Sequence, residues 1–92
     1  MTIAEAAKAL RENTVTALII DSTGEISAAL GFDWAPTAAD VIALTQQNAG
    51  KVVRFLERKS YDGSEIKAIC DSAQETLRRA ARGEFRSGAN LE

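Results

Sequence analysis

The chain has 92 residues, a formal net charge of −2 and no histidine. This length suits one domain with a single modest core, and we expect residues 1–90 to form it. The absence of histidine excludes Ser-His-Asp and Cys-His catalysis and His-ligated zinc. Because the chain also has only one cysteine, we expect no enzyme, no catalytic residue, no metal site and no cofactor.

Cysteine usage and hydropathy favour a cytoplasmic protein. One cysteine forms no internal disulfide, which suits a reducing compartment. The sequence has no run near the roughly 18 apolar residues of a membrane span and no signal peptide, so we expect no membrane partner. Leu91 and Glu92 resemble the remnant of a cloning site before an affinity tag.

The chain opens with a predicted helix over about residues 2–12. Thr2 and Glu5 have the spacing of a capping box, which satisfies free amides at a helix start. The apolar residues that share one face are Ile3, Ala6, Ala7 and Leu10. This face is narrow, so the helix must pack closely against another element.

Residues 14–30 predict a small β-hairpin. β-branched residues dominate 14–20, and the next four residues begin with Asp21 and end with Gly24, as a type I turn prefers. The alternative is a helix over 14–30 within an all-α bundle, because the apolar residues there also match helical spacing. Thr23 and Gly24 suit a helix interior poorly, which favours the hairpin.

The longest regular pattern covers residues 37–59 and predicts one long helix. Thr37 is a good N-cap, Asp40 completes a capping-box-like start, and Pro36 keeps the preceding chain out of the helix. The apolar stripe contains Ala38, Val41, Ile42, Thr45, Ala49, Val52, Val53 and Leu56. Gly50 interrupts this stripe, and a glycine in a helix interior lowers stability by about 1 kcal/mol relative to alanine. We favour a single helix, and a break at Gly50 is the alternative.

The order of helix, hairpin and long helix is loosely similar to the opening half of roadblock-type dimerisation domains. The similarity is one of element order around the Asp21-Ser22-Thr23-Gly24 turn, and no specific residue supports it. Such a domain needs further strands, and the sequence downstream predicts none. We therefore do not assign the chain to that family.

Residues 64–82 predict a third helix that begins at Ser64. Its apolar face contains Ile66, Ile69, Cys70, Ala73, Leu77, Ala80 and Ala81. We expect Cys70 to be a buried, inert thiol on that face. A short connection favours antiparallel packing against the 37–59 helix.

The same region, 65–83, also resembles the helix-turn-helix motif of bacterial and phage repressors, with Asp71-Ser72-Ala73 as the turn. In that interpretation the DNA-binding side chains are Gln74, Glu75, Arg78, Arg79 and Arg82. Lys67, Asp71 and Ser72 depart from the motif, and an acidic chain is unusual for a DNA-binding protein. We favour the unbroken helix.

Two surface features suggest a binding function. Residues 1–50 carry two bases and six acids, whereas residues 51–86 carry nine bases and six acids. This asymmetry is either an ordinary solvated surface or a basic patch for a partner. We expect Phe32 and Trp34 to cover the core beneath the start of the long helix. The alternative is that Trp34 is an exposed anchor for a partner, because tryptophan is enriched at binding hot spots.

Together these patterns predict an α+β, helix-dominated domain with helices at about 2–12, 37–59 and 64–82 and a hairpin at about 14–30. We expect a small non-enzymatic protein-binding regulator or inhibitor of bacterial or phage origin. The alternative is a helix-turn-helix transcriptional regulator, and only then would nucleic acid be a partner. The predicted partner-binding residues are Trp34, Arg54, Arg58, Arg78, Arg79 and Arg82. Because thin cores often gain stability by oligomerising, we slightly favour a homodimer over a monomer.

Overall fold

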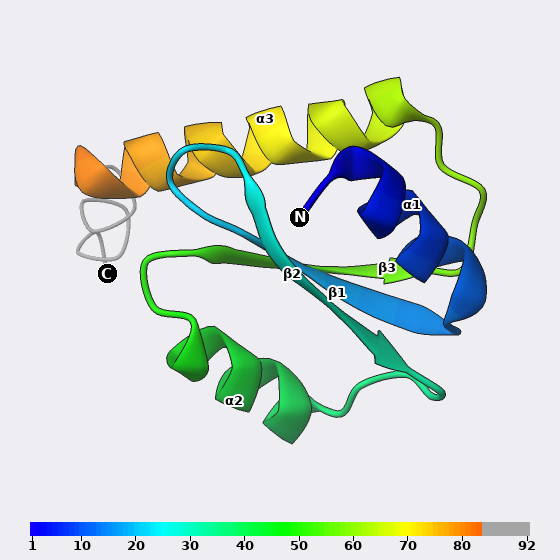
Figure 1. The fold of residues 1–92 in the computed structure, drawn as a ribbon. Coiled ribbons are helices and arrows are strands. Elements are labelled where there is room, and N and C mark those ends of the chain that lie inside the picture. The colour runs from blue at the N-terminus through cyan, green and yellow to red at the C-terminus, as the bar shows by residue number, and fades with distance from the viewer. Residues whose placement is uncertain (84–92) are drawn as a thin grey trace.

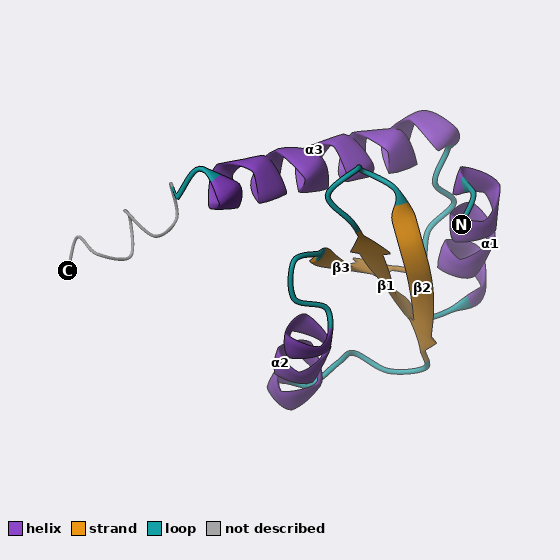
Figure 2. Cartoon of the chain, turned by 60° about the vertical axis from the view of Figure 1, so that its left-hand side comes forward, coloured by secondary structure: helices purple, strands orange, loops and turns teal. Residues whose placement is uncertain are grey.

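The computed structural model describes residues 1–83. Their elements are α1 (Ile3–Glu12), β1 (Val15–Ile20), β2 (Ile26–Phe32), α2 (Ala38–Gln47), β3 (Val52–Glu57) and α3 (Gly63–Ala81). The three strands of this part form one antiparallel sheet in the order β2-β1-β3. Helices α1 and α3 lie on one face, and α2 lies on the other (Figures 1 and 2).

The α+β class is confirmed, whereas two details of the prediction are wrong. The sheet has three strands instead of a lone hairpin, and helices account for fewer than half of the residues. The predicted cloning remnant at Leu91 and Glu92 lies outside the described residues, as does the end of the 1–90 domain.

The fold is built around β1, whose six residues are all buried. Alternate side chains of a strand point to opposite faces. Leu18 and Ile20 join a core cluster with Leu10 of α1 and Ile66 of α3. The intervening residues, such as Ile19, therefore face the side on which α2 lies. Both faces of this strand must be apolar, which explains the unbroken run of apolar residues in 17–20.

The helix starts follow from local side-chain chemistry. In each helix the N-cap side chain accepts from the backbone three residues on, and the carboxylate there accepts from the N-cap backbone. The three pairs are Thr2 with Glu5, Thr37 with Asp40, and Asp62 with Glu65. The first two starts are confirmed. The third prediction is off by two residues, because Asp62 caps α3 and Ser64 donates to it at 2.6 Å.

The two strands predicted in 14–30 are present as β1 and β2 of the three-stranded sheet, with β2 extending to Phe32, and the alternative helix there is wrong. The Asp21 carboxylate fixes the turn by accepting from the backbone amides of Thr23 at 2.9 Å and Glu25 at 3.2 Å. Gly24 has a φ of +83°, which glycine adopts without strain. At the other end of β2, a side chain at Gly31 would collide with the side chain of Asn13, which closes α1.

The single helix predicted for 37–59 is wrong. Helix α2 ends at Gln47, Gly50 has a φ of +82°, and Val52–Glu57 is a strand. The break at Gly50, considered above as the alternative, is the correct interpretation. The residues after it are rich in β-branched and aromatic side chains, and they pair with the edge of β1 that the hairpin leaves open. The predicted antiparallel packing of two long helices is therefore absent.

The helix-turn-helix predicted as an alternative over 65–83 is also absent. Helix α3 continues without interruption through Asp71, Ser72 and Ala73, where the motif needs a turn. Ala73 is fully buried in the core that α3 shares with β1. One continuous helix keeps this residue and Ile66 on the same buried face, so the third predicted helix is confirmed.

The turn at Gly50 gives a direct test of the chain path between α2 and β3. Gly50→Ala should lower the free energy of unfolding by about 1–2 kcal/mol, because an L side chain is disfavoured at a left-handed φ. No atom lies within 4 Å of the added Cβ, so the effect comes from the backbone alone. Urea-induced unfolding followed by circular dichroism measures it.

The matched control for this test is Gly63→Ala at the start of α3. The added Cβ would meet only Ile3 Cγ2, at 3.9 Å. We expect no loss of stability there and a gain of at most about 1 kcal/mol, because alanine favours a helix. Equal effects of the two substitutions would contradict the assigned turn.

Candidate functional site

The main candidate site is an apolar surface on the side of the sheet where α2 lies. No residue of α2 is buried, and Val41 and Ile42 are 37% and 56% exposed. Trp34, in the connector from β2 to α2, is 60% exposed. We call Trp34, Val41 and Ile42 the α2 surface. Large apolar side chains left exposed in this way mark sites of interaction with other proteins.

This surface stays exposed because α2 covers the sheet only partly. The helix lies closest to β3, and its sequence provides Leu44 as a half-buried contact. On the same side of the sheet the rings of Phe32 and Phe55 lie 6.2 Å apart between centroids and tilted by 45°. Val41 and Ile42 are not part of this contact and remain exposed.

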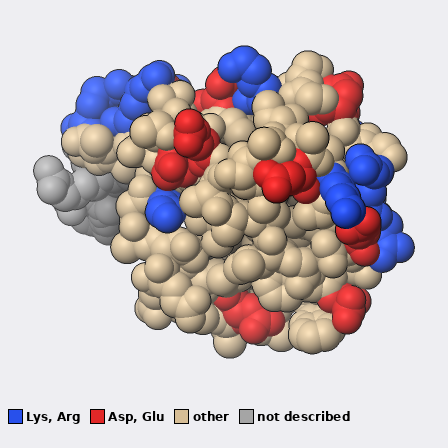
Figure 3. Space-filling model, in the orientation of Figure 1, with Lys and Arg blue, Asp and Glu red and all other residues tan. Residues whose placement is uncertain are grey.

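The charge around the α2 surface has one sign. Residues 31–50 include two acids, Asp33 and Asp40, and no lysine or arginine. Figure 3 shows acidic residues and no basic ones along the lower edge of the molecule, on the α2 side. A partner that fits this surface would present apolar side chains with basic groups around them.

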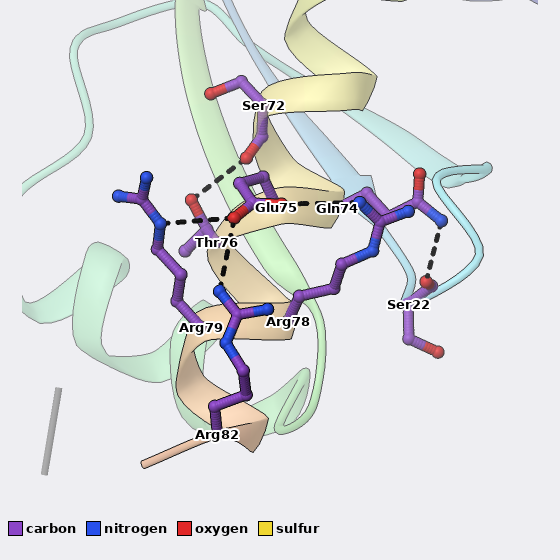
Figure 4. Close-up of polar contacts among 8 residues, drawn as sticks. All are labelled: Ser22, Ser72, Gln74, Glu75, Thr76, Arg78, Arg79 and Arg82. Atoms are coloured by element: carbon purple, nitrogen blue, oxygen red, sulfur yellow. Dashed lines mark hydrogen bonds and ion pairs between the residues drawn. The ribbon is translucent and has the colours of Figure 1, made fainter. Parts of the chain in front are cut away.

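The predicted contact residues Arg78, Arg79 and Arg82 form a second, separate feature at the end of α3. All three approach the Glu75 carboxylate, at 3.4, 3.3 and 3.5 Å (Figure 4). Desolvation opposes ionisation of Glu75, but hydrogen bonds from Arg78 and Arg79 and the charge of Arg82 outweigh it and lower its pKa. Such exposed pairs add little stability, so the cluster is mainly a solvated positive surface.

The other two predicted arginines contact the protein itself. Arg54 Nη2 donates to Thr76 Oγ1 of α3 at 3.5 Å. Arg58 donates to the backbone carbonyl of Asn13 at 3.3 Å and to Thr14 Oγ1 at 3.4 Å, and so connects the end of β3 to the start of β1.

The six predicted partner-binding residues therefore do not form one surface. Trp34 and Arg58 lie near the end of the sheet where Val15 pairs with Phe32. The arginines of α3 lie beyond Gln74, which reaches Ser22 in the turn at the opposite end of the sheet (Figure 4).

The residues proposed to bind DNA lose their predicted arrangement. Gln74 and Glu75 would begin a recognition helix, but both lie in the middle of α3. Gln74 Nε2 donates to the Ser22 carbonyl at 3.4 Å, and Glu75 lies among the three arginines. Neither residue stands at a helix start, where the motif presents side chains to base edges.

Two members of the α2 surface were missed in the sequence. Val41 and Ile42 were placed on the buried stripe of a long helix, and the structure exposes both. Their spacing is that of a buried face, so periodicity gave no warning. Charge gave no specific signal either, because lysine and arginine are absent from all of residues 12–50.

Cys70 borders a surface hollow of about 420 Å³ between α1, α3 and the start of β2. The thiol is buried, as predicted, with 6% of the residue exposed. Burial, followed by the nearby Asp71 charge, raises its pKa, so the unreactive thiol form dominates at neutral pH. Among residues 1–83 there is also no group of three or more His, Cys, Asp or Glu side chains that could hold a metal ion.

Comparisons of the chain with protein-family models, with curated proteins and with solved structures find no match. In the described part of the chain, none of the helices has the length and apolar character needed to cross a bilayer.

The state of Cys70 can be checked by thiol labelling. In the native protein we expect reaction with a disulfide reagent to be more than about tenfold slower than in the urea-unfolded chain, because the thiol is shielded and un-ionised. The rate is followed by absorbance at neutral pH. Equal rates in the two states would show that Cys70 is accessible and would reopen the hollow as a reactive site.

Proposed function

We propose that the protein is a small, non-enzymatic, cytoplasmic regulator or inhibitor that acts by binding another protein through the α2 surface. The observation that supports this is the exposure of Trp34 and Ile42 beside a helix with no buried residue. Tryptophan in such a position supplies a large rigid contact, and it is enriched among residues that dominate binding energy.

The chemistry of the surface indicates what a partner must offer. Three apolar side chains form its centre, and Asp33 and Asp40 are the charges nearest in sequence. A complementary partner has an apolar pocket for the indole ring and lysine or arginine at the rim. A standard interface covers about 800 Å² on each side, so the α2 surface would be its centre and not its whole extent.

The arginines at the end of α3 have a different role in this proposal. Arg78 and Arg79 share the Glu75 carboxylate with Arg82, and residues 72–83 contain three arginines and one acid. Such a charge increases the association rate with an acidic region of a partner more than it increases affinity. We keep these three residues as secondary contacts.

Trp34→Ala tests the proposal once a partner has been isolated by affinity capture from the native host and identified by mass spectrometry. We expect the dissociation constant to rise at least about thirtyfold, since hot-spot residues contribute about 2 kcal/mol or more. The free energy of unfolding should change by no more than about 0.5 kcal/mol, because the side chain is exposed. Titration calorimetry and circular dichroism measure the two quantities.

Lys8→Ala on the opposite side of the sheet is the control. Lys8 is an exposed residue of α1, so its loss should leave both affinity and stability unchanged. Unchanged affinity in Trp34→Ala would remove the α2 surface from the interface. A large loss of stability in Trp34→Ala would instead show that Trp34 contributes to the core.

A further inference from the structure

The two free edges of the sheet differ in how they are protected against pairing with another strand. Edge strands usually carry charges, proline or bulges that prevent such pairing. Strand β3 contains Arg54 and Glu57 and is followed by Arg58. Strand β2 has the sequence ISAALGF, with no charged residue and no proline. Its one irregularity is at Ser27, where the register with β1 shifts. From Ala28 to Phe32 the edge of β2 therefore carries none of these protections.

The backbone groups that β2 leaves unpaired follow from the register. The Arg58 amide donates to the Thr14 carbonyl, so even-numbered residues of β1 hydrogen-bond toward β3 and odd-numbered ones toward β2. The odd-numbered residues Val15, Ala17 and Ile19 pair with Phe32, Leu30 and Ala28. These three residues of β2 therefore bond to β1. The amides and carbonyls of Ala29 and Gly31 consequently point outward from the free edge.

The part of β2 that can pair regularly is centred on Leu30. The register is interrupted between Ile19 and Ile20, at the turn end of the hairpin. From Ala28 to Phe32 it is continuous, and Leu30 is the midpoint of that segment. Leu30 is 38% exposed and lies on the α2 side of the sheet.

We propose that β2 pairs antiparallel with β2 of a second copy of this chain, about a two-fold axis at Leu30. The result is a dimer with a six-stranded sheet in the order β3-β1-β2-β2-β1-β3. The outward groups of Ala29 bond to those of Gly31 in the second copy, and the reverse. The two Leu30 side chains face each other in a non-hydrogen-bonded pair, where side chains lie closest.

The absence of charge on β2 favours a second copy of the chain as the partner strand, and the extent of the regular segment favours the register centred on Leu30. A neutral strand places no like charges opposite each other when it meets its own copy, as a strand with charges can. Centred on Leu30, the pairing sets the whole regular segment Ala28–Phe32 opposite the same segment of the second copy. Shifted by one residue to centre on Ala29, it would set Gly31 opposite Ser27 and Phe32 opposite Ile26, where the register of β2 is interrupted.

Light scattering after size-exclusion chromatography over a concentration series tests the dimer. We expect the wild-type protein to have twice the chain mass of 9.8 kDa. Leu30→Lys and Leu30→Glu should each raise the dimer dissociation constant at least about tenfold, because each places like charges at the axis. Mixing the two variants should restore a dimer, because opposite charges then face each other. That restoration also shows that both variants are folded.

The matched control is Ile42→Lys, at a more exposed apolar residue of α2. It should leave the dimer intact, since α2 is not at the proposed axis. A wild-type protein that stays monomeric at every concentration would overturn the proposal. Dissociation by Ile42→Lys, or a mixture of the Leu30 variants that stays monomeric, would overturn it as well.

A cysteine pair tests the register. Residues opposite each other in a non-hydrogen-bonded pair have Cα atoms about 4.5 Å apart, within the range of a disulfide. Leu30→Cys should therefore form a covalent dimer when a mild oxidant accepts two electrons from the two thiols. Ala28→Cys should not, because Ala28 lies opposite Phe32 of the second copy. Equal cross-linking of both variants would refute the register. The wild-type protein, whose one cysteine is the buried Cys70, gives the background level of cross-linking under the same conditions.

Discussion

The structure depends on the burial of β1 from all sides. Strands β2 and β3 satisfy its backbone groups on two edges, while helices lie over both of its faces. Its one buried polar side chain, Thr16, donates to the Ala9 carbonyl of α1 at 3.1 Å. Every other element is placed by the need to cover this strand, and none of the buried side-chain polar atoms in the described residues lacks a partner.

The two faces of β1 are covered unequally, and this inequality places the candidate site. On one face α1 and α3 contribute Leu10, Ile66 and Ala73 to a dense cluster. On the other, the ten residues of α2 lie against β3 without burying any side chain of their own. Apolar residues on that side are therefore needed to cover the sheet and are also exposed to solvent. A surface of this kind is stabilised further when another protein covers it.

The sequence predicts what is decided locally and fails where distant contacts decide. The capped start at Thr37 and the turn between Asp21 and Gly24 depend on neighbouring residues, and both were predicted. Strand β3 was missed because Val52, Val53 and Leu56 fit helical spacing as well as a strand buried on both faces. Only pairing with β1 decides between them. The exposure of Trp34 and the separation of the arginines likewise depend on where α2 and α3 pack.

The two neighbours of β1 differ in their distance along the chain. Strand β2 returns through a short turn, whereas β3 arrives only after all of β2 and α2. Closing the longer loop costs more conformational entropy, so the hairpin and α1 can assemble before β3 adds to them. Strand β3 is then held by six residue pairs with β1, whereas α2 has no buried residue. Local opening is therefore expected to begin at α2, the helix that carries Val41 and Ile42.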